Sequence, residues 1–253
     1  MKWLTLSVLW LFNNVSAHAG EVHVAVASNF LQPLNALSSA FEHEFGHEII
    51  ISSASSGKLY AQIQHGAPFD VFLSADSDKP ARVAREIGGS SQPFAYAIGR
   101  LVLWCPSQCE LPLTSLRTGN FTKLAIANPR LAPYGLAAKQ TLRAVMPHKM
   151  KTQTTSDLMR DKWVMGENIS QTYRFVETGN ATLGLVARSQ ITGSLNATQH
   201  WLVPSAWHQP IQQEGILLER GKSNPAAHDF VNFITSQAAQ TLLQQYGYDM
   251  PHE

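Results

Sequence analysis

The sequence has little charge of either sign and no cluster of basic residues. Its 253 residues carry 19 Lys and Arg against 18 Asp and Glu, which leaves a formal net charge of +1. A protein that binds nucleic acid or lies on an anionic membrane normally shows a basic run or patch. The composition therefore excludes nucleic acid as an expected partner.

Long apolar runs are missing everywhere except at the N-terminus. There, Lys2 precedes an apolar run over 3–12 that is too short to span a bilayer, and 17–19 (Ala-His-Ala) is a small-x-small cleavage pattern. These features predict a removable signal peptide over 1–19, cleaved near Ala19. No Cys lies at the new N-terminus, so a lipid anchor is not indicated. We expect a soluble protein that is exported.

Cysteine occurs only twice, at Cys105 and Cys109. In an oxidising compartment a local disulfide is their expected state, with free thiols as the alternative because so short a loop constrains the geometry. A zinc site lacks the further ligands that it would need, and the ten His are scattered without a repeated ligand spacing. The sequence therefore predicts a disulfide and no resident metal.

What the chain does contain is a short inner strand followed at once by an amphipathic helix. Residues 22–27 place three Val on one face, and apolar residues recur at spacings of three and four over 30–45. The chain turns between them at Ser28 and Asn29, where a helix start presents unpaired N–H groups and the positive end of its dipole. This turn is a candidate anion site. The alternative is an ordinary cap, in which Asn29 and Gln32 form a capping box.

A second strand, Ser-rich turn, helix and strand follow over 48–76. The turn is Ala-Ser-Ser-Gly at 54–57, and Ser56 is its best-placed hydroxyl, with a plain N-cap as the alternative role. Two such turns in one parallel sheet would both open at the carboxyl ends of the strands, where ligands of open α/β sheets bind. The nearest cations in sequence are His23, which we expect to point away from the turn, and Lys58.

The same order of strand, loop and helix recurs further along the chain. Strands are predicted over 123–127, 183–187 and 213–219, and helices over 135–145, 169–179, 225–234 and 237–246. This organisation predicts an α/β protein with two lobes, in which two helix starts from each lobe face a common cleft. An exported serine hydrolase is the enzymatic alternative. No Gly-x-Ser-x-Gly elbow is present, and no motif ties a His to Ser28 or Ser56, so we expect no catalysis.

Several motifs together resemble one family. They are Ala27-Ser28-Asn29, Ala54-Ser55-Ser56-Gly57 with Leu59, the run from Gly66 to Asp76, Asn128-Pro129, Pro133-Tyr134-Gly135, Gly184-Leu185-Val186 and Tyr246-Gly247-Tyr248. Over essentially the whole mature chain, the sequence resembles the periplasmic molybdate-binding proteins of ABC importers, which belong to the type II periplasmic binding proteins. The resemblance implies two lobes, each a mostly parallel sheet flanked by helices. Residues 20–97 and 212–253 would form the first lobe, and residues 98–211 the second.

The resemblance also implies a ligand site. The oxyanion contacts would be the hydroxyl and N–H groups of Ser28 and Ser56, Asn29, and the backbone N–H groups of Tyr134 and Ile169. One branch of the family adds a Tyr hydroxyl at the end of the Gly-x-Val strand. This chain has Ala187 there, so we expect that contact to be absent.

The implied function is to bind molybdate, and tungstate with it, and to deliver the oxyanion to the membrane permease of an ABC importer. The protein would act as a monomer without a cofactor, and the only metal would be that of the bound oxyanion. Donors spaced for molybdate cannot all reach the smaller sulfate, and each unmet donor costs on the order of 1–3 kcal/mol. Another tetrahedral oxyanion, such as sulfate or chromate, stays open as the alternative ligand, and a sensory or adhesive module of the same fold stays open as the alternative class.

Overall fold

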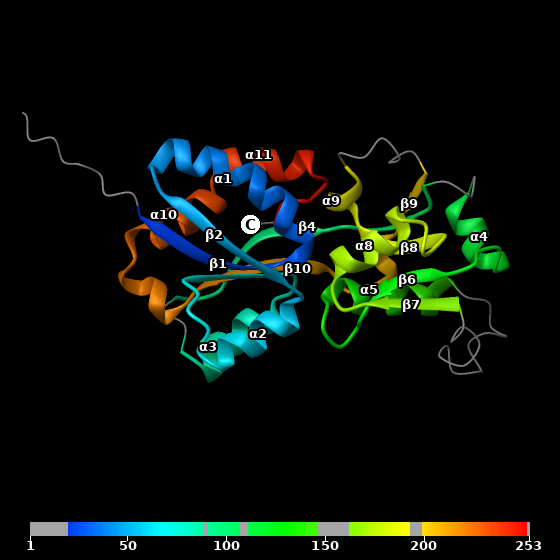
Figure 1. The fold of residues 1–253 in the computed structure, drawn as a ribbon, viewed down its shortest axis with the longest axis horizontal. Helices are drawn as coiled ribbons and strands as arrows, with labels where there is room; N and C mark the ends of the chain where they lie inside the picture. Colours follow the sequence, from blue (N-terminus) through cyan, green and yellow to red (C-terminus); the bar gives the residue numbers. More distant parts are fainter. Residues whose placement is uncertain (1–19, 89–90, 107–110, 146–161, 193–198, 252–253) are drawn as a thin grey trace, which may run out of the picture.

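The computed structural model describes residues 20–88, 91–106, 111–145, 162–192 and 199–251. They form two lobes, each built on a five-stranded sheet with helices around it (Figure 1). The predicted α/β class with two lobes is therefore confirmed. The expected signal peptide over 1–19 lies outside the described residues. Within the described ranges, no helix combines the length and the apolar character that crossing a membrane requires.

The sheet of the first lobe has the strand order β2-β1-β3-β10-β4. Its strands are β1 (Glu21–Ala27), β2 (Glu48–Ala54), β3 (Val71–Ser74), β4 (Phe94–Gly99) and β10 (Ile211–Leu217). β1 pairs in parallel with β2 and β3, whereas β10 is antiparallel to both β3 and β4. Because β1, β2 and β3 run in the same direction, their carboxyl ends lie along one edge of the sheet.

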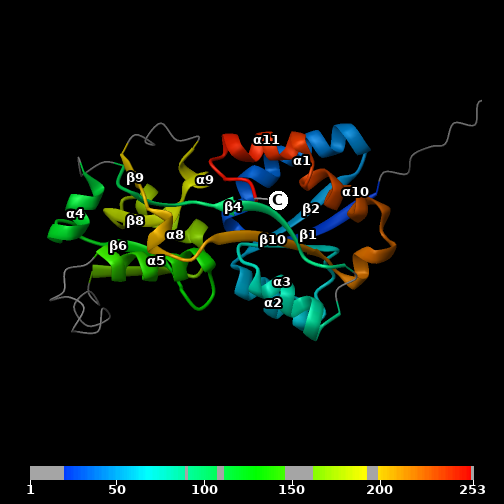
Figure 2. The same cartoon turned by 180° about the vertical axis from the view of Figure 1, so that it is seen from behind.

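Helices cover both faces of this sheet (Figures 1 and 2). α1 (Leu31–Phe45), α10 (Pro225–Ile234) and α11 (Gln237–Gln245) pack on one face, and α2 (Ser56–Gln64) and α3 (Asp78–Glu86) pack on the other. Phe41 and Phe230 are fully buried in the first layer, and Leu59 and Phe72 in the second. Each such side chain stabilises the fold by about 1.5–3 kcal/mol. The two layers therefore hold the strand ends, and the turns that follow them, in fixed positions.

The second lobe has the strand order β7-β6-β8-β5-β9. Its strands are β5 (Leu101–Trp104), β6 (Leu124–Ala127), β7 (Trp163–Gly166), β8 (Leu183–Ala187) and β9 (His200–Leu202), and its helices are α4 (Pro112–Thr118), α5 (Pro133–Val145), α8 (Ile169–Glu177) and α9 (Arg188–Ile191). β6 is parallel to β7 and β8, and β5 is antiparallel to β8 and β9. Three short 3-10 helices complete the described chain: η1 (Ser28–Phe30), η3 (Ser205–Trp207) and η4 (Glu219–Ser223).

The chain crosses between the lobes twice, next to the paired strands β4 and β10 (Figure 2). It leaves the first lobe after β4, which ends at Gly99, and β5 of the second lobe begins at Leu101. It returns to the first lobe in β10. The C-terminal segment braces this crossing, because the Arg100 guanidinium lies 2.8 Å from the Asp249 carboxylate. The expected lobe boundaries at 97/98 and 211/212 fall within β4 and β10 and stay a prediction.

Candidate functional site

The five residues expected to contact the ligand line one cavity between the lobes. Ser28 and Asn29 belong to η1, Ser56 begins α2, Tyr134 lies in the first turn of α5, and Ile169 begins α8. All five are buried. The other lining residues of the cavity are Ala27, Ser55, Ala75, Ala132 and Pro133. The structure thus brings together the four helix starts that the sequence places on a common cleft.

Strand pairing explains why these helix starts meet. Ala27 at the end of β1 pairs with Ala54 at the end of β2, so the turns that carry Ser28 and Ser56 leave the sheet side by side. In the second lobe the ends of β6 and β7 pair in the same way. The start of α5 also lies close to β6: a Cβ added to Gly135 would come within 2.3 Å of the Ala127 carbonyl oxygen. A glycine is therefore required next to Tyr134.

Backbone N–H groups of the helix starts remain available as donors. Those of Ser56, Tyr134 and Ile169 lie in the first turns of their helices, where an N–H group has no intrahelical acceptor. Among the described residues, none of the three donates in a turn, loop or cap hydrogen bond. Each helix start also carries roughly half an elementary positive charge. The cavity can therefore hold an anion without a cationic side chain.

Within the described ranges, neither predicted serine donates its hydroxyl proton in a hydrogen bond. The Ser56 Oγ accepts a hydrogen bond from the Ala75 N–H at 3.0 Å, which orients the hydroxyl and leaves its proton for a ligand. Ser28 contacts the other lobe through its carbonyl oxygen, which accepts from the Ser170 hydroxyl at 2.9 Å. Both side chains can thus donate to an oxyanion in the cavity.

The side chain of Asn29 has a different role from the one expected. Its Nδ2 donates to Gln213 Oε1 at 2.8 Å and to the Tyr248 hydroxyl at 2.9 Å, so both of its N–H bonds are used inside the protein. Of the donors of Asn29, only the backbone N–H has no acceptor among the described residues, while the side-chain Oδ1 is buried without a partner. The alternative interpretation of this turn, a capping box of Asn29 with Gln32, is wrong, because α1 follows a 3-10 turn and its start has no side-chain cap hydrogen bond.

The cavity contains no charged side chain. Its lining, which is drawn from the described residues, has no Lys, Arg, His, Asp or Glu. Burial raises the pKa of the Tyr134 phenol well above its usual value, so this group is neutral as well. His23 lies on β1 and does not line the cavity, as expected. Any anion held here is therefore held by neutral donors and helix dipoles.

Contacts between the lobes close the cavity. The Gly57 N–H donates to the Leu131 carbonyl oxygen at 2.9 Å, and a Cβ on Gly57 would lie only 3.0 Å from the same oxygen. The Ser189 hydroxyl donates to the Asn29 carbonyl oxygen at 3.0 Å. At the surface, Lys58 forms an ion pair with Glu167 of the second lobe. These bonds can form only when the lobes are together, so the structure represents a closed state.

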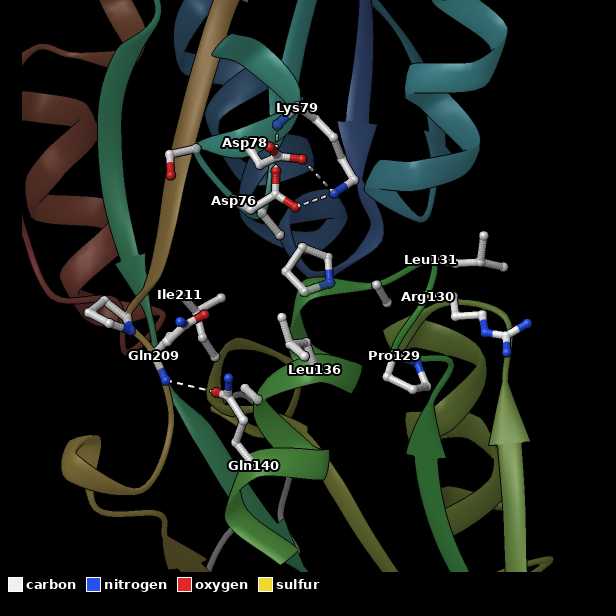
Figure 3. Close-up of a pocket in the computed structure, with 16 residues that line it drawn as sticks. Asp76, Asp78, Lys79, Pro129, Arg130, Leu131, Leu136, Gln140, Gln209 and Ile211 are labelled. Atoms are coloured by element: carbon white, nitrogen blue, oxygen red, sulfur yellow. Dashed lines mark hydrogen bonds and ion pairs between the residues drawn. The ribbon is translucent and has the colours of Figure 1, made fainter. Parts of the chain in front are cut away.

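A wider depression opens beside the cavity (Figure 3) and shares Ala75, Ala132 and Pro133 with it. It is larger than the cavity, so size alone would point to it as the ligand site. On its first-lobe wall the Lys79 ammonium lies 2.7 Å from Asp76 and 3.9 Å from Asp78. Because two carboxylates balance this cation, the wall offers no excess positive charge to an anion.

Residues 22–249 match the family model of the bacterial extracellular solute-binding proteins. This chain belongs to that family. The molybdate-binding protein ModA of Azotobacter vinelandii is 40% identical to this solute-binding protein over 240 residues, which cover 93% of this chain and 92% of the relative. ModA of Rhodobacter capsulatus is 37% identical over 237 residues, which cover 92% of this chain and 89% of the relative.

A solved structure agrees with the sequence relatives. The periplasmic molybdate-binding protein of Azotobacter vinelandii superposes on this solute-binding protein with a TM-score of 0.82 and 32% identity, over 91% of this chain and 100% of that one. The resemblance stated from the sequence motifs is therefore confirmed.

Sequence reasoning missed several residues that complete the site of this solute-binding protein. They are Ser55 in the cavity wall, Gln213 and Tyr248 around Asn29, and Ser170 and Ser189 across the lobes. Ser55 and Tyr248 did lie in motifs that carried the resemblance. Gln213, Ser170 and Ser189 had no local signal, because a polar residue in a strand or helix usually faces solvent.

Cys105 is buried and disulfide-bonded. Its expected partner, Cys109, lies outside the described residues, so their pairing stays a prediction.

Proposed function

We propose that this solute-binding protein binds molybdate, and tungstate of nearly the same size and charge, in the periplasm and delivers it to the membrane permease of an ABC importer. The observation that carries the proposal is the buried cavity in which hydroxyls and N–H groups from four helix starts converge without any charged side chain. The relatives named as molybdate-binding proteins support the same ligand.

The arrangement suits a dehydrated tetrahedral dianion. A charged ligand gains about 1.5–3 kcal/mol from each hydrogen bond that it accepts, and helix dipoles add to that attraction. The donors proposed here are the hydroxyl and N–H groups of Ser28 and Ser56 and the backbone N–H groups of Asn29, Tyr134 and Ile169. They come from both lobes, so only the closed state can offer all of them at once. Binding would therefore favour the closed form, which a permease can distinguish from the empty protein.

A role in binding rather than catalysis also follows from the cavity. Ser28 and Ser56 would need a neighbouring general base to act as nucleophiles, and no His, Asp or Glu of the described chain lines the cavity. We therefore propose that the protein is not an enzyme and needs no cofactor.

The proposal includes the processing and state of the exported protein. The signal peptide over 1–19 would be removed near Ala19, and the product would be a periplasmic monomer with a Cys105–Cys109 disulfide. Residues 20–97 and 212–253 would form the first lobe and residues 98–211 the second, with the hinge in β4 and β10.

Titration of the purified exported protein with molybdate, tungstate, sulfate, phosphate and chromate tests the ligand. A ligand present at a thousand times its dissociation constant, and bound only by the native protein, adds about 4 kcal/mol to the free energy of unfolding. The melting temperature should then rise by several degrees with molybdate and tungstate. Calorimetry should show a stoichiometry of one. No shift with either anion would contradict the proposal, and a larger shift with sulfate would assign the site to another oxyanion.

A further inference from the structure

Ser55 is one of three cavity-lining residues, with Asn29 and Tyr134, whose buried side chains have a polar atom without a hydrogen-bond partner among the described residues. The residue is 2% exposed, and its Oγ has no hydrogen-bond partner among the described residues. Buried side-chain hydroxyls in native proteins nearly always have a partner, so each exception calls for a physical reason. Ser55 lines the cavity next to Ser56, and the missing partner is therefore to be sought in the cavity itself.

Helix capping does not explain Ser55. It occupies the N-cap of α2 with extended backbone angles, φ −70° and ψ 148°, yet its side chain makes no cap hydrogen bond. Two other helices show what a working cap looks like here. Asn168 of α8 accepts from the Gln171 N–H, and Ser236 of α11 accepts from the Ala239 N–H. Ser55 thus has the position of a cap without performing its function.

Neighbouring groups leave the Ser55 hydroxyl free for a ligand. The Gly57 N–H is bound to the Leu131 carbonyl oxygen, and the Ala75 N–H is bound to Ser56 Oγ. From these contacts, and on the basis of the proposed function, we infer that Ser55 donates a further hydrogen bond to the bound oxyanion. The start of α2 would then present two adjacent hydroxyls to the ligand, from Ser55 and Ser56.

Replacing this hydroxyl should separate affinity from stability. Ser55→Ala removes a donor to a charged ligand, so the dissociation constant for molybdate should rise by about 10- to 100-fold. The same change deletes a buried polar atom that has no partner and breaks no cap bond. The melting temperature of the ligand-free protein should therefore stay the same or rise. A merely structural Ser55 would give the reverse, with a lower melting temperature and an unchanged affinity.

Two further variants complete the test. Ser53→Ala is the matched control, because Ser53 lies two residues earlier at an exposed position of β2, and it should change neither quantity. Ser55→Cys keeps nearly the same volume but is only a weak donor, so it should also lose affinity. It keeps the test valid if the Ala variant does not fold.

The dissociation constant of each variant is measured by calorimetry with molybdate, and the melting temperature without it. If the parent protein binds neither molybdate nor tungstate, the proposed function is wrong. If the parent binds and the Ser55 variants lose affinity tenfold or more, the inference holds. If the parent binds and the Ser55 variants lose less than tenfold, Ser55 is not a ligand donor and the proposed function stands without it.

Discussion

Buried polar groups at the two ends of the first sheet differ in whether they have hydrogen-bond partners. At the amino end of β3, the Asp70 carboxylate is 1% exposed and accepts from the His23 N–H at 2.8 Å and from Arg220 Nη1 and Asn224 Nδ2 at 3.2 Å each. At the carboxyl end, the cavity holds the Ser55 hydroxyl without a partner and the open N–H groups of helix starts. We call the amino end, where the buried carboxylate is charged and hydrogen-bonded, the satisfied end. We call the carboxyl end, where neutral donors have no acceptors, the open end.

This difference separates the residues that stabilise the fold from those that bind. A buried carboxylate must be hydrogen-bonded, and once it is, it joins β1, β3 and η4 to one another. Donors without acceptors lower the stability of the empty protein, and a bound anion can recover that loss. The run from Gly66 to Asp76, which carried much of the family resemblance, serves both ends. Asp70 acts at the satisfied end, and the Ala75 N–H orients Ser56 at the open end.

Breaking the satisfied end should have the largest effect on stability. Asp70→Ala leaves the His23 N–H without an acceptor, so the free energy of unfolding should fall by about 1–3 kcal/mol. The lost ion pair adds little, because the Arg220 side chain is 46% exposed. Chemical denaturation without ligand measures this change. The affinity of the folded variant for molybdate should not change, because Asp70 does not line the cavity.

Glu44→Ala is the control for Asp70→Ala, because Glu44 is an exposed carboxylate on α1. It should leave both quantities unchanged. If Asp70→Ala were as stable as the parent and bound molybdate more weakly, the assignment of stability to one end of the sheet and of binding to the other would be wrong.

Removing one donor from the open end should mainly affect binding. Ser28→Ala and Ser56→Ala should each weaken molybdate binding by about 1.5–3 kcal/mol. Ser56→Ala should also lower the stability of the empty protein, because it takes the acceptor from the buried Ala75 N–H, whereas Ser28→Ala should not. Ser56→Asp should abolish binding, since it places an anion against an anion. Calorimetry and thermal unfolding give the two quantities, and parental affinity in both Ala variants would place the ligand elsewhere.

The ion pair across the mouth of the cleft should have the smallest effect. The Lys58 and Glu167 side chains are 45% and 63% exposed, and exposed pairs of this kind contribute at most about 1 kcal/mol. Lys58→Ala should therefore speed the release of molybdate by no more than about fivefold, and adding Glu167→Ala should not speed it further. The difference in release rate between variant and parent should vanish at high salt. Stopped-flow measurements of the single and double variants would show this. Fully additive effects would mean that the pair does not hold the lobes closed.

Much of the fold could be predicted because its inner strands and amphipathic helices carry local patterns. α10, for example, has the predicted bounds, 225–234, and β10 begins two residues before its predicted start. β7, β9 and α4 were not predicted. β7 and β9 are edge strands of the second sheet, and their side chains are mostly half-buried or exposed. Such strands have no continuous apolar run to reveal them.

The site was predictable only in part. The helix starts and their Ser residues followed from local patterns and from the family resemblance. The role of the Asn29 side chain did not follow from a local pattern. This side chain is fixed by Gln213 and Tyr248, which lie 184 and 219 residues away in the chain. A local pattern cannot show such a contact. Nor could it show that the Ser55 hydroxyl would be left without a partner.

Neutral donors hold the oxyanion in the proposed site, and the pH dependence of the affinity tests this most directly. Burial raises the pKa of the Tyr134 and Tyr248 phenols. Because the folded-state pKa is raised, the stability that these phenols contribute is complete below their unfolded pKa of about 10 and declines only above it. Neither group should therefore change charge between about pH 6.5 and 9.

The decisive measurement is the dissociation constant for molybdate at several pH values across that range, at constant ionic strength. The dissociation constant should be nearly the same at each pH, because no side chain that lines the cavity among the described residues gains or loses a proton in this range. A His cation in the site would instead lose its charge as the pH rose through about 6.5, and the affinity would fall with it. A tenfold fall in affinity between about pH 6.5 and 8.5 that His23→Gln abolishes would show that a His cation, and not neutral donors alone, holds the oxyanion.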